Sequence, residues 1–138
     1  MSAMTWPTSW KPLPFNTPRH SVNPTPDHRS MKARRVAAEA IGTFFLVLIG
    51  PGSAMVNVYS GGSLGQVGVV LAFAFVVVAM IYALGHLSGA HINPAVTLTF
   101  WSARRFPTVE VIPYVLAQCA GAVGASLALR ATLGPVGN

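Results

Sequence analysis

The chain has 138 residues, of which 52% are hydrophobic and 9% are charged. A soluble domain carries about 25% charged residues, and no charged residue occurs between Glu39 and Arg104. This window contains two apolar runs long enough to cross a bilayer, so we expect an all-α integral membrane protein. The net charge of +6 does not indicate nucleic-acid binding, because six of the nine Lys and Arg residues precede residue 36, beside the first apolar run.

Residues 1–35 differ in composition from the rest of the chain. Their first 30 positions contain six prolines, mixed with Ser, Thr, Asn and His and without an apolar period. Such a segment cannot bury a core, so we expect a disordered, Pro-rich, basic tail. The cluster of Lys32, Arg34 and Arg35 before the first apolar run predicts that this tail is cytoplasmic.

The first expected span covers about residues 36–58 and contains two unusual residues. Glu39 lies one turn inside, where a carboxylate is costly unless it has a partner. It either sits at the interface, where the positive end of a helix favours it, or faces inward and accepts hydrogen bonds from a neighbouring loop. The sequence leaves both possibilities open. Pro51 removes one backbone hydrogen bond and is expected to kink the helix or shift its packing.

A glycine-bearing link from Tyr59 to Gly65 leads to a second expected span over about residues 66–84. Phe73 and Phe75 are its only phenylalanines. An aromatic side chain in a span usually packs against protein or contacts lipid, and the local pattern does not distinguish Phe73 from that ordinary role.

The stretch from Gly85 to Arg105 fits neither a loop nor a span. Asn93 is a favoured helix N-cap, and Pro94 is favoured at the first helical position, so we predict a helix over about residues 94–103. Ten residues rise roughly 15 Å, about half of a ~30 Å hydrocarbon core. An apolar helix of half length in a membrane chain predicts a re-entrant segment.

The positions of the charges also favour a re-entrant path. If the half-helix crossed the membrane, Arg104 and Arg105 would emerge opposite the N-terminal basic cluster, whereas a re-entrant path places both clusters in the cytoplasm. The expected fold class is therefore three transmembrane helices plus one re-entrant half-helix. Backbone over residues 88–93 would then lie at membrane depth, where it can line a wet cavity. Asn93 adds an amide donor, and the helix N-terminus adds about +0.5 e, which repels cations and orients water or hydroxyl groups.

No residue pattern indicates an enzyme, a metal site or a cofactor. His86 and His91 have no Cys, Asp or Glu beside them, so a hydrogen-bonding role in stabilising the loop is favoured over metal binding. Cys119 is the single cysteine, which excludes a disulfide within one chain.

The third expected span covers about residues 109–133. Gln118 is expected to form a hydrogen bond to a neighbouring helix. Its small residues should form a face for close helix packing, and these residues are Gly121, Gly124, Ala125 and Ala128.

The chain resembles the aquaporin and glycerol-facilitator family, the major intrinsic proteins. Gly85 to Thr97, Gly-His-Leu-Ser-Gly-Ala-His-Ile-Asn-Pro-Ala-Val-Thr, is similar to the first Asn-Pro-Ala signature of that family. The run Met80 to Leu84 before it is similar to the nodulin-like subgroup. The other segments that carry the resemblance are Ala38 to Phe45, Arg104 to Pro107, Tyr114, Ala117 and Gln118.

The resemblance implies a six-span fold with two half-helices in two inverted repeats, assembled as a tetramer in the lipid bilayer. It implies passive transport of water or small neutral solutes such as glycerol. Glu39 would brace the re-entrant loop, a role also expected of His86. Phe73 would occupy the second-helix position of the narrow aromatic filter. The expected pore-lining residues are Asn93, Pro94, Ala95, Phe73 and His91.

Two features depart from the family pattern. Pro51 stands where the family usually has a small flexible residue. The 138 residues also carry one Asn-Pro-Ala triplet, whereas a family pore needs two half-helices that meet at the midplane. We therefore expect a channel half that is truncated or needs a complementary second-half chain and does not conduct alone. The alternative is a non-conducting three-span membrane subunit that packs through its small-residue faces.

Overall fold

The computed structural model describes residues 28–134, which form four helices and no strand. The helices are α1 (His28–Tyr59), α2 (Gly65–Ser88), α3 (Pro94–Ser102) and α4 (Thr108–Leu133). Three of them, α1, α2 and α4, are long and apolar enough to cross a membrane. With nine residues, α3 is too short to cross. The predicted fold class, three spans and one half-helix, is confirmed.

The first helix begins earlier than the sequence predicts. Residues 1–27 of the expected tail lie outside the described residues, but residues 28–35 are helical, so the prediction of disorder is wrong for that part. The physical reason is that this basic segment also contains good helix formers, among them Met31, Lys32 and Ala33. Helical hydrogen bonding therefore extends from the apolar segment through the charged residues before it.

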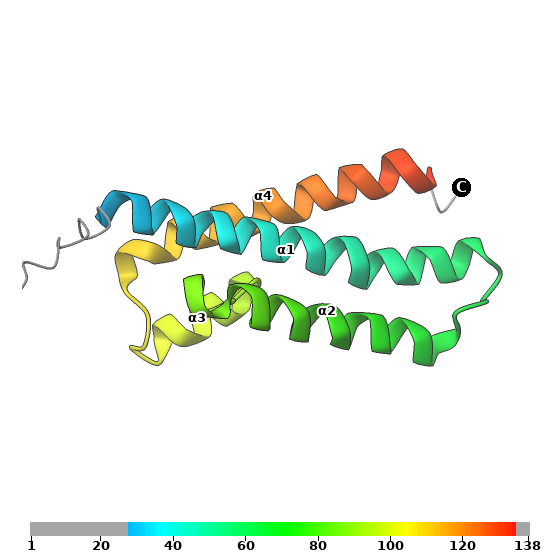
Figure 1. The fold of residues 1–138 in the computed structure, drawn as a ribbon, viewed down its shortest axis with the longest axis horizontal. Coiled ribbons are helices and arrows are strands. Elements are labelled where there is room, and N and C mark those ends of the chain that lie inside the picture. Colours follow the sequence, from blue (N-terminus) through cyan, green and yellow to red (C-terminus); the bar gives the residue numbers. More distant parts are fainter. Residues whose placement is uncertain (1–27, 135–138) are drawn as a thin grey trace, which may run out of the picture.

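The central helix of the structure is α1, with α2 and α4 packed on either side of it (Figure 1). Small residues permit these contacts. Gly121 of α4 lies against the α1 backbone at Ala40, where any added Cβ would collide with the carbonyl oxygen. On the α2 side of α1, Gly42 leaves room for Ile92 and Leu84. Close backbone approach at glycine is the usual way in which membrane helices pack.

The short helix α3 returns to the end of the structure at which α1 and α4 begin. Its start lies near the middle of α1, because Ile92 packs beside Gly42. Its last turn lies beside the start of α4, where Trp101 Nε1 donates a hydrogen bond of 3.0 Å to Thr108 Oγ1. Figure 1 shows this path from the middle of the structure back to one end. The half-helix is therefore re-entrant.

We call this end of the structure, formed by residues 28–35 and 102–110, the basic end. Of the seven Lys and Arg residues in the described part of the chain, only Arg130 lies away from it, in the last turn of α4. The six others are Arg29, Lys32, Arg34, Arg35, Arg104 and Arg105.

Candidate functional site

The loop between α2 and α3 has an irregular and strained backbone. Gly89 closes α2 in a left-handed conformation, with φ of 91°. Two non-glycine residues, Ala90 and Ile92, also have positive φ, at 47° and 44°. Each such residue costs on the order of 1 kcal/mol. This conformation persists only if other contacts hold it.

The carboxylate of Glu39 provides those contacts. Glu39 is completely buried on α1. Its Oε1 accepts hydrogen bonds from Ser88 Oγ at 2.6 Å and from the His91 N–H at 3.0 Å. Its Oε2 accepts from the Ile92 N–H at 2.7 Å and from Gln118 Nε2 at 2.7 Å. Four donors compensate the cost of burying the charge and tie the loop to both α1 and α4.

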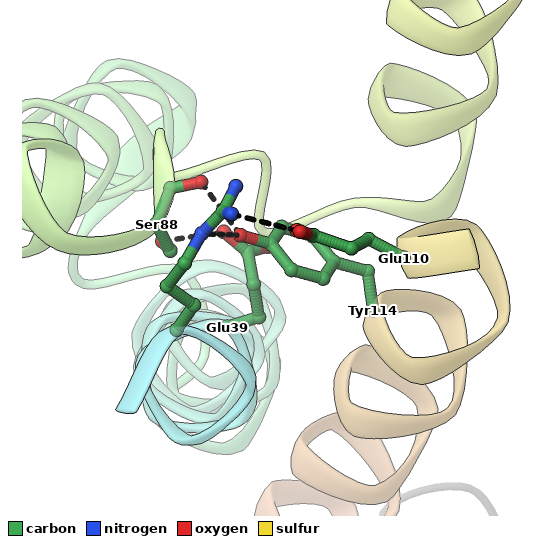
Figure 2. A network of polar contacts seen from close by, with 5 residues as sticks. Glu39, Ser88, Glu110 and Tyr114 are labelled. Atoms are coloured by element: carbon green, nitrogen blue, oxygen red, sulfur yellow. Dashed lines mark hydrogen bonds and ion pairs between the residues drawn. The ribbon is translucent and has the colours of Figure 1, made fainter. Parts of the chain in front are cut away.

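A second set of polar contacts joins the loop to the basic end (Figure 2). The Tyr114 hydroxyl donates to the Ser88 carbonyl at 2.9 Å and accepts from Arg35 Nε at 3.1 Å. Arg35 Nη1 also lies 2.8 Å from Glu110 Oε2. The sequence indicated Arg35 only as part of the basic cluster and predicted none of these contacts, because its partners lie 75 and 79 residues away along the chain.

Asn93 connects the loop to α3. Its Oδ1 accepts a hydrogen bond of 2.9 Å from the Ala95 N–H, and Pro94 occupies the first helical position. The side chain is exposed, and its Nδ2 has no hydrogen-bond partner among residues 28–134. A free amide donor therefore stands next to the positive end of the half-helix. Ala95 is also exposed, and Pro94 is half-buried.

The His91 side chain points away from this exposed surface. It is only 7% exposed. Its ring stacks on Phe100 at a centroid distance of 4.9 Å and also contacts Phe106 and Tyr114. Its Nδ1 lies 3.1 Å from Thr97 Oγ1. The structure thus does not bring the His91 ring together with Asn93 and Ala95, because the aromatic residues enclose it.

His86 is exposed in the last turn of α2, and its side chain forms no hydrogen bond within the described part of the chain. The structure therefore gives no contact by which it would brace the loop. Among residues 28–134, no group of three or more His, Cys, Asp or Glu side chains could hold a metal ion.

Phe73 lies on α2, away from the basic end. Its ring packs over Gly50 of α1, where an added Cβ would lie 2.5 Å from the Phe73 Cε1 atom. Gly50 is eight residues beyond Gly42, which corresponds to about 12 Å along α1 from the level of Ile92. Phe73 remains 39% exposed, so part of the residue is accessible.

The sequence of the chain matches the family described as major intrinsic protein over residues 27–137. The chain belongs to this family. Individual major intrinsic proteins are also similar to it. A probable aquaporin AqpM of Archaeoglobus fulgidus is 44% identical over 120 residues, covering 75% of this chain and 49% of that protein.

Two further relatives come from a plant and a bacterium. Aquaporin NIP1-3 of Oryza sativa subsp. japonica is 43% identical over 116 residues, which cover 84% of this chain and 41% of the relative. Aquaporin Z of Bradyrhizobium diazoefficiens is 48% identical over 97 residues, which cover 70% of this chain and 40% of the relative. The chain thus spans about half or less of these relatives of the major intrinsic protein family, and the expected family membership is confirmed.

Family membership and the three apolar helices together identify an integral membrane protein of a channel family. Members of this family transport small molecules and are not enzymes. The relatives are aquaporins by name, and they include NIP proteins as well as bacterial and archaeal members.

Proposed function

We propose that residues 28–134 form one half of a membrane channel for water or small neutral solutes, in which Asn93 Nδ2 donates a hydrogen bond to the permeating molecule. The main support for this proposal is the position of the Asn93 side chain. The exposed Asn93 amide has a free donor at the start of a half-helix that begins near the middle of the structure. The Glu39 carboxylate holds the loop that positions it.

Electrostatics supports a neutral permeant. The N-terminus of α3 carries a partial charge of about +0.5 e, which disfavours cations. Water and hydroxyl groups can accept from Asn93 Nδ2 and donate to backbone carbonyls of the loop. Such contacts replace hydration along a path without forming or breaking a covalent bond.

Pro94 and Ala95 would line the same path beside Asn93, since both are accessible. Phe73 would narrow the path about 12 Å from this level, where its accessible side chain presents an apolar surface. For His91, only the backbone carbonyl is a candidate for lining, because the ring is enclosed by aromatic residues.

The proposed orientation places the basic end in the cytoplasm. Six of the seven Lys and Arg side chains of residues 28–134 lie there, which is the distribution that the positive-inside rule describes. The pathway would be completed by a second half-helix from another part of the polypeptide or from a complementary chain. Assembly as a homo-tetramer in the bilayer is proposed from the family resemblance.

Stopped-flow light scattering of proteoliposomes tests this function. Three samples are compared. They contain the chain alone, the chain together with a polypeptide that carries the second repeat of a relative, and that second polypeptide alone. We expect increased osmotic water permeability only when both halves are present. Permeability equal to that of empty vesicles in every sample would support the alternative, a non-conducting packing subunit.

The variant Asn93→Asp tests the hydrogen-bond donor of the Asn93 side chain separately from its role as the N-cap of α3. Asp retains an oxygen that can cap α3 but lacks the Nδ2 donor, and it adds a negative charge. The matched control is Asn57→Asp, because Asn57 Oδ1 also accepts from a backbone N–H, that of Gly65 at 3.0 Å, in the turn after α1. We expect Asn93→Asp to lose water permeability and Asn57→Asp to retain it.

A further inference from the structure

We infer that the basic end carries a binding site for the headgroup of an anionic phospholipid, in a pocket between α1 and α2. The pocket has a volume of about 130 Å³. Met31, Arg34 and Arg35 line it from α1, and His86 and Leu87 line it from α2. It thus combines two apolar side chains with three that can donate hydrogen bonds.

The donors in this pocket are available to a ligand. Arg34 is exposed and has no hydrogen bond or ion pair within residues 28–134, and the same is true of the His86 side chain. Arg35 is held in place because Nε donates to Tyr114 and Nη1 pairs with Glu110, while Nη2 has no partner among the described residues. Arginine side chains that converge on one pocket suit a phosphate group, whose oxygens accept several hydrogen bonds.

The charge around the pocket favours an anion. The described residues contain two acidic side chains, and both already have partners: Glu39 is saturated by four donors, and Glu110 is paired with Arg35. Six cationic side chains lie at the same end of the structure. Basic pockets between transmembrane helices are one kind of site that binds anionic lipid headgroups.

The pocket lies at the depth of lipid headgroups. With 24 residues, α2 is about 36 Å long, slightly more than the ~30 Å hydrocarbon core. His86 and Leu87, in the last turn of α2, therefore reach the interface at one end of the span. The phosphate groups of the surrounding phospholipids therefore lie at the same depth as the pocket.

An apolar surface for an acyl chain begins at the pocket and follows α2. Tyr82, Val78, Phe75 and Leu71 lie 4, 8, 11 and 15 residues before His86, so they share one face of the helix. All four are exposed, Tyr82 by 85% and Phe75 by 68%. This continuous surface favours a phospholipid over a soluble phosphate, because a lipid can cover the pocket and the apolar face together.

Native mass spectrometry of the full chain in detergent, titrated with a single lipid, tests the site. Phosphatidylglycerol should bind more tightly than phosphatidylcholine with the same acyl chains. Arg34→Gln should weaken phosphatidylglycerol binding about fivefold. The control is Arg104→Gln, which changes the net charge equally but lies in a different cavity at the same end. Its effect should be less than about twofold at ~0.15 M salt, where charges beyond about 8 Å are screened.

Two further probes distinguish a lipid from a soluble anion. Inorganic phosphate should bind more than about tenfold more weakly than phosphatidylglycerol, because it lacks the acyl chain. Val78→Asn should weaken binding of the lipid while leaving the helical circular dichroism signal unchanged, since this side chain is exposed.

Three results would overturn the inference: equal binding of the two lipids, equal losses for Arg34→Gln and Arg104→Gln, or phosphate binding as tight as lipid binding. These measurements require neither conduction nor a known orientation. Their outcome is therefore independent of the proposed channel function.

Discussion

Replacing Glu39 with Gln tests how the loop before α3 is held. The substitution keeps the shape of the side chain but turns one of its two acceptor oxygens into an NH₂ donor. If the NH₂ takes the Oε1 position, it faces the His91 N–H, and if it takes the Oε2 position, it faces the Ile92 N–H. Both are backbone donors that cannot be reversed, so at least one of them loses its acceptor.

The expected loss of unfolding free energy comes from this one backbone N–H that is left without an acceptor. The other two partners can adapt, because the Ser88 hydroxyl can rotate and the Gln118 amide can turn over. Turning would bring Gln118 Oε1, which is buried without a hydrogen-bond partner, towards the new NH₂ group. A buried donor left without an acceptor costs about 1–3 kcal/mol. We therefore expect Glu39→Gln to lower the free energy of unfolding by about 1–3 kcal/mol.

The matched control is Glu110→Gln, which makes the same chemical change in the other acidic side chain of the described residues. Glu110 pairs with Arg35 at the partly exposed basic end, where such a pair contributes about 0–1 kcal/mol. Unfolding in mixed detergent micelles compares the two variants. Hydrogen exchange adds a local readout, and protection of the amides in residues 89–93 should fall about 5- to 150-fold in Glu39→Gln alone.

The opposite result would be an equal loss of unfolding free energy in the two variants, with residues 89–93 exchanging at the wild-type rate in both. That result would mean that the backbone of the loop holds its conformation without the carboxylate.

Three other substitutions test packing and polar contacts. Tyr114→Phe removes the hydroxyl that bonds to the loop and should cost about 1–2 kcal/mol of unfolding free energy in the same detergent assay. Gly121→Ala places a Cβ against the α1 backbone and should cost about 1–3 kcal/mol, measured as a lower midpoint of thermal unfolding. Gly50→Ala should displace the Phe73 ring. The displacement should shift the fluorine resonance of protein labelled with fluorophenylalanine. In a conducting assembly, it should also change the ratio of glycerol permeability to water permeability.

The two glycine substitutions have internal controls. Gly124→Ala places its Cβ at 3.6 Å from the Phe44 ring, an ordinary contact, so this variant should be neutral or gain up to about 1 kcal/mol from helix propensity. Equal effects at Gly124 and Gly121 would contradict the close approach of α1 and α4. Gly50→Ala should also lower the midpoint of thermal unfolding, because the added Cβ meets the Phe73 ring. Adding Phe73→Leu should recover part of that loss, and additive effects would contradict direct contact.

Local chemistry determined the parts of the fold that the sequence predicts well. Asn93 and Pro94 are neighbours in the chain, so their capping geometry at the start of α3 needs no tertiary information. The lengths of the apolar runs likewise predict three spans. The expected hydrogen bond from Gln118 to a neighbouring helix is confirmed, although its partner was unknown until α1 and α4 were placed side by side.

Features that depend on tertiary contacts could not be predicted from sequence. The residues alone left the role of Glu39 open between interface and interior, and the prediction that it braces the loop came from the family resemblance, because only the packed structure places the loop amides against its carboxylate. The residue pattern gave His86 and His91 the same hydrogen-bonding role, and we expected His86 to brace the loop and His91 to line the pore. The structure instead leaves His86 exposed and encloses the His91 ring among aromatic rings. Arg35 was seen only as part of a basic cluster, although it pairs with side chains about 75 residues away.

The central claim is that Asn93 Nδ2 contacts the permeating molecule in an assembled channel. The most direct measurement is the osmotic water permeability of proteoliposomes that contain this chain and a complementary second repeat, compared among wild type, Asn93→Asp and Asn57→Asp. We predict high permeability for wild type and Asn57→Asp, and permeability near that of empty vesicles for Asn93→Asp with unchanged helix content. Wild-type permeability in correctly folded Asn93→Asp would contradict the claim.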